Sequence, residues 1–154
     1  MAHLSGVIKY MKTYEIIDHT ADIAIKVYGK NLEALFLHAA QAMFEIMLEP
    51  IKKKSIFSKT EHEKFSLNKQ GNNLEEIFVF WLSELLYLFS TDGLIMQKAN
   101  IEKLDANAIQ AEVTGEIFSP DFYRIKTEIK AVTYHELEIK KTEHGYEVQV
   151  IFDV

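Results

Sequence analysis

The chain has 154 residues and no cysteine, and its 17 Lys and Arg residues against 23 Asp and Glu residues give a net charge of -6. That length fits one domain with one hydrophobic core, and the lack of cysteine excludes disulfides, thiolate metal sites and thiol nucleophiles. The acidic balance disfavours unaided binding to nucleic acid and suits a cation site or a basic protein partner.

The longest apolar stretch, residues 77–89, is interrupted by Ser83 and Glu84. It is shorter than the roughly 20 residues that a membrane span needs. We therefore expect a cytoplasmic protein that makes no membrane contact. No sequence feature indicates self-association, so we also expect a monomer.

The amino-terminal part predicts a leader followed by a hairpin. Residues 1–13 lack the features of a secretory signal and read as a flexible leader. β-branched and aromatic residues at 14–18 and 23–28 flank the polar break at 19–22, a pattern that is typical of two strands joined by a short turn.

A first helix is predicted at residues 32–47. Asn31 can cap it, its apolar residues recur at helical spacing, and it should stop before Pro50. Residues 51–59 are basic and polar, which predicts an exposed connection leading into a short strand near residues 64–67.

A second helix is predicted at residues 74–90, between a turn and cap signal at 70–73 and a stop around Asp92 and Gly93. Apolar residues nearly encircle it, so we expect it to be the buried centre of the core. An aromatic cofactor-binding box is the alternative interpretation, and core packing is the favoured one.

The rest of the chain predicts strands separated by short polar turns, at residues 94–104, 108–117, 123–132, 134–140 and 146–152. Strands and helices mix early and strands run together late. The predicted fold class is therefore α+β: two helices packed on a largely antiparallel or mixed β-sheet, in a two-layer single domain that covers residues 14–154.

Asp22 and Asp153 are the first candidate functional residues. Asp22 lies at a strand start between apolar neighbours, where an unpaired carboxylate is costly to bury, and Asp153 ends an apolar strand beside the Val154 carboxyl terminus. If the last strand lies beside the first hairpin, the three carboxylates converge, with His19 nearby as a nitrogen donor. The alternative is that Asp22 caps a turn and Asp153 trails into solvent.

Such a cluster would bind a divalent metal ion. Ligands that are mostly oxygen favour Ca²⁺, Mg²⁺ or Mn²⁺, and a participating imidazole would widen the choice toward Zn²⁺. No phosphate-binding glycine loop, metalloprotease helix motif or serine-hydrolase elbow occurs in the sequence, so the common enzyme templates are absent.

Lys130, Thr133 and His135 form a second candidate set, in a polar and aromatic cluster where two predicted strands meet. We interpret them as candidate partner contacts. The alternative is that His135 is a packed or surface residue without a ligand.

Several stretches of the chain resemble the archease family in order and spacing. They are His19-Thr20-Ala21-Asp22-Ile23-Ala24-Ile25, Gly29-Lys30-Asn31-Leu32-Glu33, the helix with Trp81-Leu82-Ser83-Glu84-Leu85-Leu86-Tyr87-Leu88, Glu128-Ile129-Lys130-Ala131-Val132-Thr133-Tyr134-His135, and Val150-Ile151-Phe152-Asp153-Val154. The resemblance runs from about Tyr14 to Val154, and its strength lies in the several independent matches taken together.

The resemblance implies an accessory protein of the RtcB-type RNA ligase, the GTP- and metal-dependent enzyme of tRNA splicing and RNA repair. Such a protein is no ligase itself: it promotes guanylylation of the ligase and multiple turnover, and it meets tRNA or other RNA only through the ligase. By the same resemblance Asp22 and Asp153 are metal-binding carboxylates, with the Val154 carboxylate and His19 as further ligands.

One position departs from the family. Archeases often have a histidine shortly before the 127–135 segment, where this chain has Tyr123. Tyrosine is a poor divalent-ion ligand at neutral pH because its phenol is protonated. Two other functions stay open: a stand-alone metal-dependent hydrolase that uses the same carboxylates, and a chaperone-like scaffold for RNA-processing enzymes.

Overall fold

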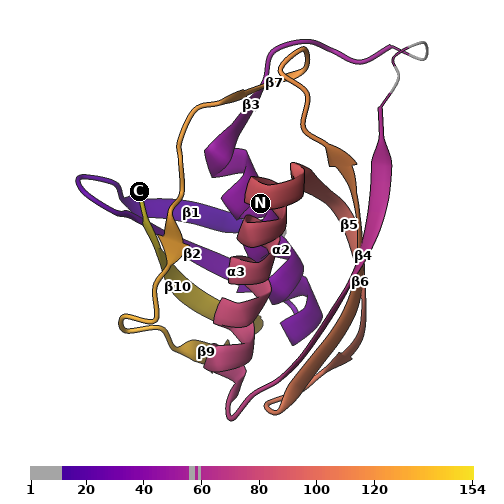
Figure 1. Ribbon diagram of the computed structural model, residues 1–154. Coiled ribbons are helices and arrows are strands. Elements are labelled where there is room, and N and C mark those ends of the chain that lie inside the picture. The colour runs from indigo at the N-terminus through magenta and orange to yellow at the C-terminus, as the bar shows by residue number, and fades with distance from the viewer. Residues whose placement is uncertain (1–11, 56–57, 59) are drawn as a thin grey trace, which may run out of the picture.

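The computed structural model describes residues 12–55, 58 and 60–154 (Figure 1). Most of the predicted leader, residues 1–11, lies outside the described residues, as do residues 56, 57 and 59 of the predicted basic connection. In chain order the elements are β1 (Tyr14–Asp18), β2 (Ile23–Gly29), α2 (Leu32–Met47), β3 (Leu48–Pro50), β4 (His62–Gln70), α3 (Leu74–Asp92), β5 (Leu94–Leu104), β6 (Ala108–Ile117), β7 (Tyr123–Ile125), β8 (Ala131–Val132), β9 (Ile139–Thr142) and β10 (Gly145–Asp153).

The strands form three sheets in which every pairing is antiparallel. The largest has the order β1-β2-β10-β8, with β9 also paired to β10; β3 pairs with β7, and the third sheet has the order β4-β6-β5. Figure 1 shows α2 and α3 between the two larger sheets, so both sheets bury a face against the helices. The predicted α+β class, with two helices on antiparallel sheet, is confirmed. The predicted two-layer arrangement is wrong, because a second sheet covers the other side of the helices and makes three layers.

The start of helix α2 is fixed by a side-chain cap and by a close approach of the preceding strand. The Asn31 side chain accepts the backbone N–H of Ala34 at 2.8 Å, which satisfies one of the unpaired donors of the first turn. Gly29 ends β2 directly beside this turn, and a Cβ there would lie 2.3 Å from the backbone nitrogen of Leu35. The helix can therefore pack closely on the strand that precedes it only because residue 29 is glycine.

Helix α3 is the centre of the core, as the sequence predicts. The Asn73 side chain caps it, and Gly93 ends it in the left-handed conformation at a φ of 73° that favours glycine. The Trp81 side chain is fully buried and donates its indole N–H to the carbonyl oxygen of Phe36 at 2.8 Å. This aromatic face packs inside the molecule and is no open cofactor surface. In the described ranges, no helix is both long and apolar enough to span a membrane.

Residues 123–132 do not form the continuous strand that the sequence predicts. β7 pairs with β3, whereas β8 pairs with β10 in another sheet. Between them the N–H groups of Lys126 and Thr127 both donate to the carbonyl oxygen of Met47, at 2.8 and 3.3 Å. The prediction of one strand is wrong because the chain leaves one sheet before it joins the next.

The predicted strand at residues 134–140 is wrong over its first half. The Leu137 N–H donates to the carbonyl oxygen of Tyr134 at 3.1 Å and closes a turn, in which Glu136 has a φ of 54°. Strand β9 begins only at Ile139.

The short strand predicted near residues 64–67 is longer than expected, because β4 pairs with β6 along its whole length.

Two tyrosine hydroxyls hold the first hairpin in place through hydrogen bonds to carboxylates. The Tyr14 hydroxyl donates to the Glu45 carboxylate of α2, and the Tyr28 hydroxyl donates to the Glu15 carboxylate of β1, both at 2.7 Å. Burial, then the hydrogen bond to the carboxylate and its negative charge, raises the pKa of each phenol to about 12. Each protonated phenol therefore stabilises the folded state. This contribution to the free energy of unfolding is fully present below about pH 10 and is lost as the pH rises through about 12.

Replacing Tyr14 by phenylalanine should lower the free energy of unfolding at pH 7 by about 1 kcal/mol, because a partly exposed hydrogen bond to a carboxylate is lost. The Tyr14→Phe variant should also lose less stability than the wild type between pH 10 and pH 12. Urea unfolding across this pH range measures both effects. Tyr87→Phe is the control, since Tyr87 is 59% exposed; equal alkaline losses in wild type and Tyr14→Phe would contradict the assignment.

Candidate functional site

The ladder between β2 and β10 brings the start and the end of the described chain together. Its last paired residues are Phe152 and Ile23. The next residues along the chain are Asp153 and Asp22, so both aspartates lie at the same end of this ladder. Figure 1 shows the carboxyl end of the chain beside the β1–β2 loop. The predicted meeting of the last strand with the first hairpin is thus present in the fold.

Strand alternation assigns both aspartates to the outer face of this sheet. Val150 and Phe152 are fully buried on the face that packs on the helices. Asp153 follows with the opposite orientation, and a residue directly opposite in an antiparallel pair shares the same face. Both Asp22 and Asp153 are exposed, and within the described residues neither carboxylate makes a hydrogen bond or an ion pair. They are exposed acidic groups at the same end of one strand pair, and neither is neutralised by a described residue.

The hairpin tip carries a third acidic residue that the sequence interpretation missed. Asp18 accepts the backbone N–H of Thr20 at 3.1 Å, and the Thr20 N–H and hydroxyl, followed by weaker effects that include His19, hold the pKa of Asp18 below its usual range. A bulge between Ile16 and Asp18 shifts the register just before this turn. Aspartate two residues before threonine is a common turn pattern, which is the signal that could have revealed it. His19 lies exposed in the same loop.

The second candidate set flanks β10 from its other side. The Lys130 N–H donates to the carbonyl oxygen of Asp153 at 2.7 Å, and the Thr133 N–H donates to that of Ile151 at 3.0 Å. The Thr133 hydroxyl is buried and has no hydrogen-bond partner among the described residues. Two of the three predicted partner contacts therefore line the same strand end as the aspartate pair.

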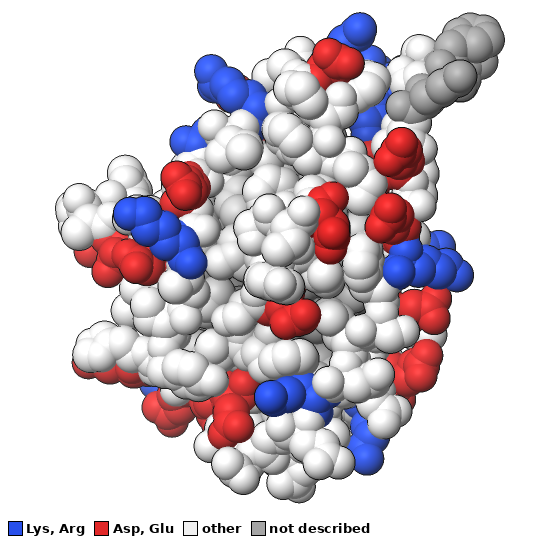
Figure 2. Space-filling model, in the orientation of Figure 1, with Lys and Arg blue, Asp and Glu red and all other residues white. Residues whose placement is uncertain are grey.

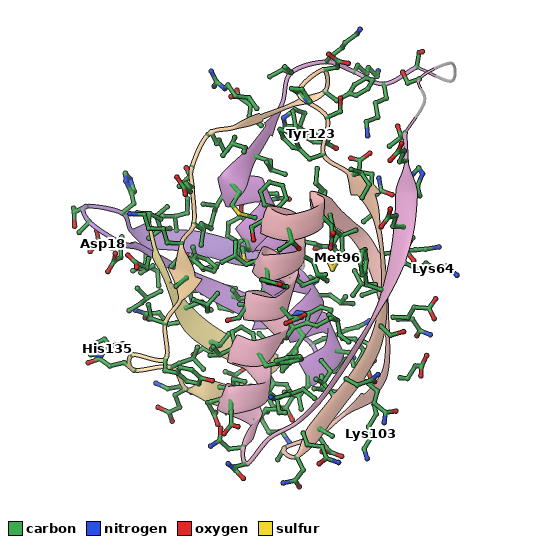
Figure 3. All side chains as sticks on the ribbon, viewed as in Figure 1. Asp18, Lys64, Met96, Lys103, Tyr123 and His135 are labelled. Carbon is green, nitrogen blue, oxygen red and sulfur yellow. The ribbon has the colours of Figure 1, made fainter. Side chains whose placement is uncertain are left out.

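His135 lies farther along the same outer face. It is exposed in the turn before β9, with its Nε2 3.6 Å from the Glu136 carboxylate, and it borders a polar cleft of about 240 Å³ with Lys26, Glu147 and Gln149. Figure 3 shows His135 on a loop separate from the hairpin that carries Asp18. The structure thus puts His135 on the face of the aspartates but not beside them.

Residues 14–154 match the archease protein family (MTH1598/TM1083), which is nearly all of the described chain. The chain belongs to the archease family. Among curated relatives, protein archease from Methanosarcina mazei is 39% identical over 93% of this chain and 97% of its own length. Protein archease from Saccharolobus islandicus is 34% identical over 94% of this chain and its full length.

Two solved archease-like structures share the fold. The solution structure of protein 1598 from Methanobacterium thermoautotrophicum has a TM-score of 0.66 and 30% identity, over 92% of this chain and 98% of that one. The crystal structure of an archease from Thermotoga maritima, described as a possible chaperone, has a TM-score of 0.57 and 25% identity. The match covers 91% of this chain and 96% of that one.

The donor set of this archease suits a hard ion in an open site. Within the described part of the chain, no group of three or more His, Cys, Asp or Glu side chains is placed to hold a metal ion. Asp22 and Asp153 offer carboxylate oxygens, to which the Val154 carboxylate would add more. Mg²⁺ is commonly held by one or two protein carboxylates together with waters and the phosphates of a substrate. The residues present therefore fit an ion that is shared with a partner better than one enclosed by this chain.

Tyr123 lies away from this site. Figure 3 shows Tyr123 at the end of the molecule where β7 lies, distant from Asp18. Its hydroxyl donates to the buried carboxylate of Glu116, which also pairs with Lys54. Burial raises the pKa of Tyr123, so the phenol stays protonated at neutral pH. The departure from histidine therefore leaves the aspartate pair untouched.

Replacing Thr133 by valine should raise the free energy of unfolding by about 1 kcal/mol, because it removes a buried hydroxyl that has no partner and keeps the side-chain shape. Thermal unfolding measures the change. The control is Thr114→Val on β6, where the hydroxyl is not among the buried unpaired atoms and the effect should stay within about 0.5 kcal/mol. A lower melting temperature for Thr133→Val would show that the hydroxyl has a stabilising partner.

Proposed function

We propose that this archease family member activates an RtcB-type RNA ligase in tRNA splicing and RNA repair, by promoting guanylylation of the ligase and multiple turnover. The family membership supports an accessory role, and one structural observation supports the site. The β2–β10 ladder ends at Ile23 and Phe152, next to Asp22 and Asp153, which are exposed and unpaired within the described residues. Two unneutralised carboxylates held together are suited to a cation or to cationic groups of a partner.

In this proposal Asp22, Asp153 and the Val154 carboxylate hold a divalent ion (Ca²⁺, Mg²⁺ or Mn²⁺) at the ligase active site, with His19 as a further ligand. A bound cation there would neutralise charge that develops on the phosphates of GTP during phosphoryl transfer. The chain's own task is positional: the ladder fixes the two aspartates, and the Lys130 N–H fixes the main chain at Asp153. No nucleophile from this chain is required.

Partner contact would use the same end of the sheet. Lys130 and Thr133 lie along β10, and His135 extends the surface along its outer face. Figure 2 shows acidic side chains around the end of the β1–β2 hairpin, with basic side chains beside them. An acidic tip suits a basic groove such as the one that an RNA ligase needs for RNA, while a net charge of -6 disfavours direct RNA binding.

A chaperone-like scaffold is the second candidate function. It is favoured by the Thermotoga maritima relative, which is described as a possible chaperone. A scaffold would bind its partner with the aspartate pair playing no part. Removal of divalent ions by a chelator would then leave its effect on the partner unchanged.

The deciding experiment measures guanylylation and multiple-turnover ligation by the cognate ligase, with and without this protein. Asp22→Asn and Asp153→Asn should each lower the stimulation at least about tenfold, because each removes a charged ligand of the site. Both variants should fold normally, since neither carboxylate is bonded within the described residues. Asp121→Asn is the matched control, because Asp121 is an exposed loop aspartate.

Full stimulation by both aspartate variants would refute the ion-positioning proposal. If stimulation also survives chelator treatment of this protein, the scaffold is the correct account. Turnover of a phosphate ester by the purified protein alone, lost in both variants, would instead establish a stand-alone hydrolase.

A further inference from the structure

An apolar groove lies on the helix side of the molecule and is lined by neither Asp22 nor Asp153. It has a volume of about 360 Å³ and runs between the carboxyl-terminal half of α3 and the segment that joins β7 to β8. Its apolar walls are Met47, Leu86, Phe89, Phe118, Ile125 and Ile129. In Figure 1 this segment runs alongside α3. The volume is at the small end of ligand sites and suits a few side chains.

The groove is built on fixed aromatic walls. Phe89 stands edge-to-face against Phe118, with ring centroids 6.0 Å apart, and against Phe44 at 6.2 Å. Ile125 is 50% exposed at the rim, although it is a large apolar residue. Rigid aromatic walls and an exposed apolar rim are features of binding surfaces, because little conformational entropy is lost when a partner docks.

One wall offers unpaired main-chain groups. Within the described residues, no backbone hydrogen bond involves Glu128 or Ile129, although the preceding Thr127 and the following Lys130 are both bonded. Ile129 is only 5% exposed and borders the groove. Buried peptide N–H and C=O groups are rarely left without a partner. An extended segment lying in the groove can supply one, as an added strand does.

The charges around the groove favour a basic occupant. Glu128 is the charged side chain that lines it. Helix α3 ends here in Asp92, and its last turn has no basic residue to offset the negative end of the helix dipole. Three cations lie on the same segment as Glu128: Arg124 is already paired with Glu49, and Lys126 and Lys130 do not line the groove. Figure 2 shows both red and blue side chains around this surface.

We propose that this groove binds an extended segment of a partner protein, in which apolar residues are flanked by Lys or Arg. The apolar side chains fill the space between Phe89 and Ile129, the peptide backbone bonds to the free groups of residues 128 and 129, and the flanking cation meets Glu128. The site is independent of the proposed ligase activation, because it uses none of the residues at the end of β10.

The test selects displayed random octapeptides against the full chain and measures the enriched peptides by fluorescence anisotropy. Enriched peptides should carry apolar residues flanked by Lys or Arg. Ser90→Trp, which fills the groove, and Glu128→Lys, which reverses its charge, should each weaken binding at least about tenfold. Glu63→Lys on β4 is the matched charge control and should bind as the wild type does.

Hydrogen exchange locates the binding. A bound peptide should slow exchange of the Ile129 N–H, and Asp22→Asn should leave both exchange and affinity unchanged. No enrichment, an acidic or purely polar consensus, or undiminished binding to Ser90→Trp and Glu128→Lys would each overturn the proposal. Self-association of the wild type that Ser90→Trp abolishes would also overturn it, in favour of a second copy of this chain as the occupant.

Discussion

The antiparallel pairing of β2 with β10 is the constraint on which the rest of the site depends. It joins residues near the two ends of the described chain. Its register is fixed by side chains that the helices cover, among them Ile25, Val150 and Phe152. A slip of one residue would turn this apolar set toward solvent and Asp153 toward the core, which would cost the burial of several large side chains and add that of a charge. The packing of the inner face therefore determines which residues meet on the outer face. The meeting of two acidic residues is a by-product of apolar burial.

Acidic groups elsewhere in the molecule are used differently. Glu116, the buried charged residue of the described chain, pairs with Lys54 and accepts a hydrogen bond from the Tyr123 hydroxyl. These contacts hold the connection after β3 on the third sheet. Lys54 also lies over the Tyr123 ring, at 5.2 Å from its centroid. Asp22 and Asp153 have no such partners within the described residues. The contrast separates carboxylates that stabilise the fold from carboxylates that remain available to a cation or to another protein.

Much of this arrangement follows from local sequence. Asn31 and Asn73 mark the two helix starts, and Gly93 marks a helix end, because caps act through nearest neighbours. The aspartate pair was predicted because an apolar strand ended in Asp153 and a hairpin began near Asp22. The course of residues 123–140 could not be predicted, since β7 and β8 are short strands whose partners lie far away in the chain. Their pairing depends on tertiary packing, which overrides the β propensity of the segment.

Paramagnetic broadening by Mn²⁺ tests the central claim, that the register makes one cation site from two distant aspartates. In an amide correlation spectrum of the full chain, low concentrations of Mn²⁺ should broaden the signals around Asp22 and Asp153 together, and Asp22→Asn should abolish the broadening at both places. Broadening near only one of them, or spread evenly over exposed acidic residues, would contradict the account.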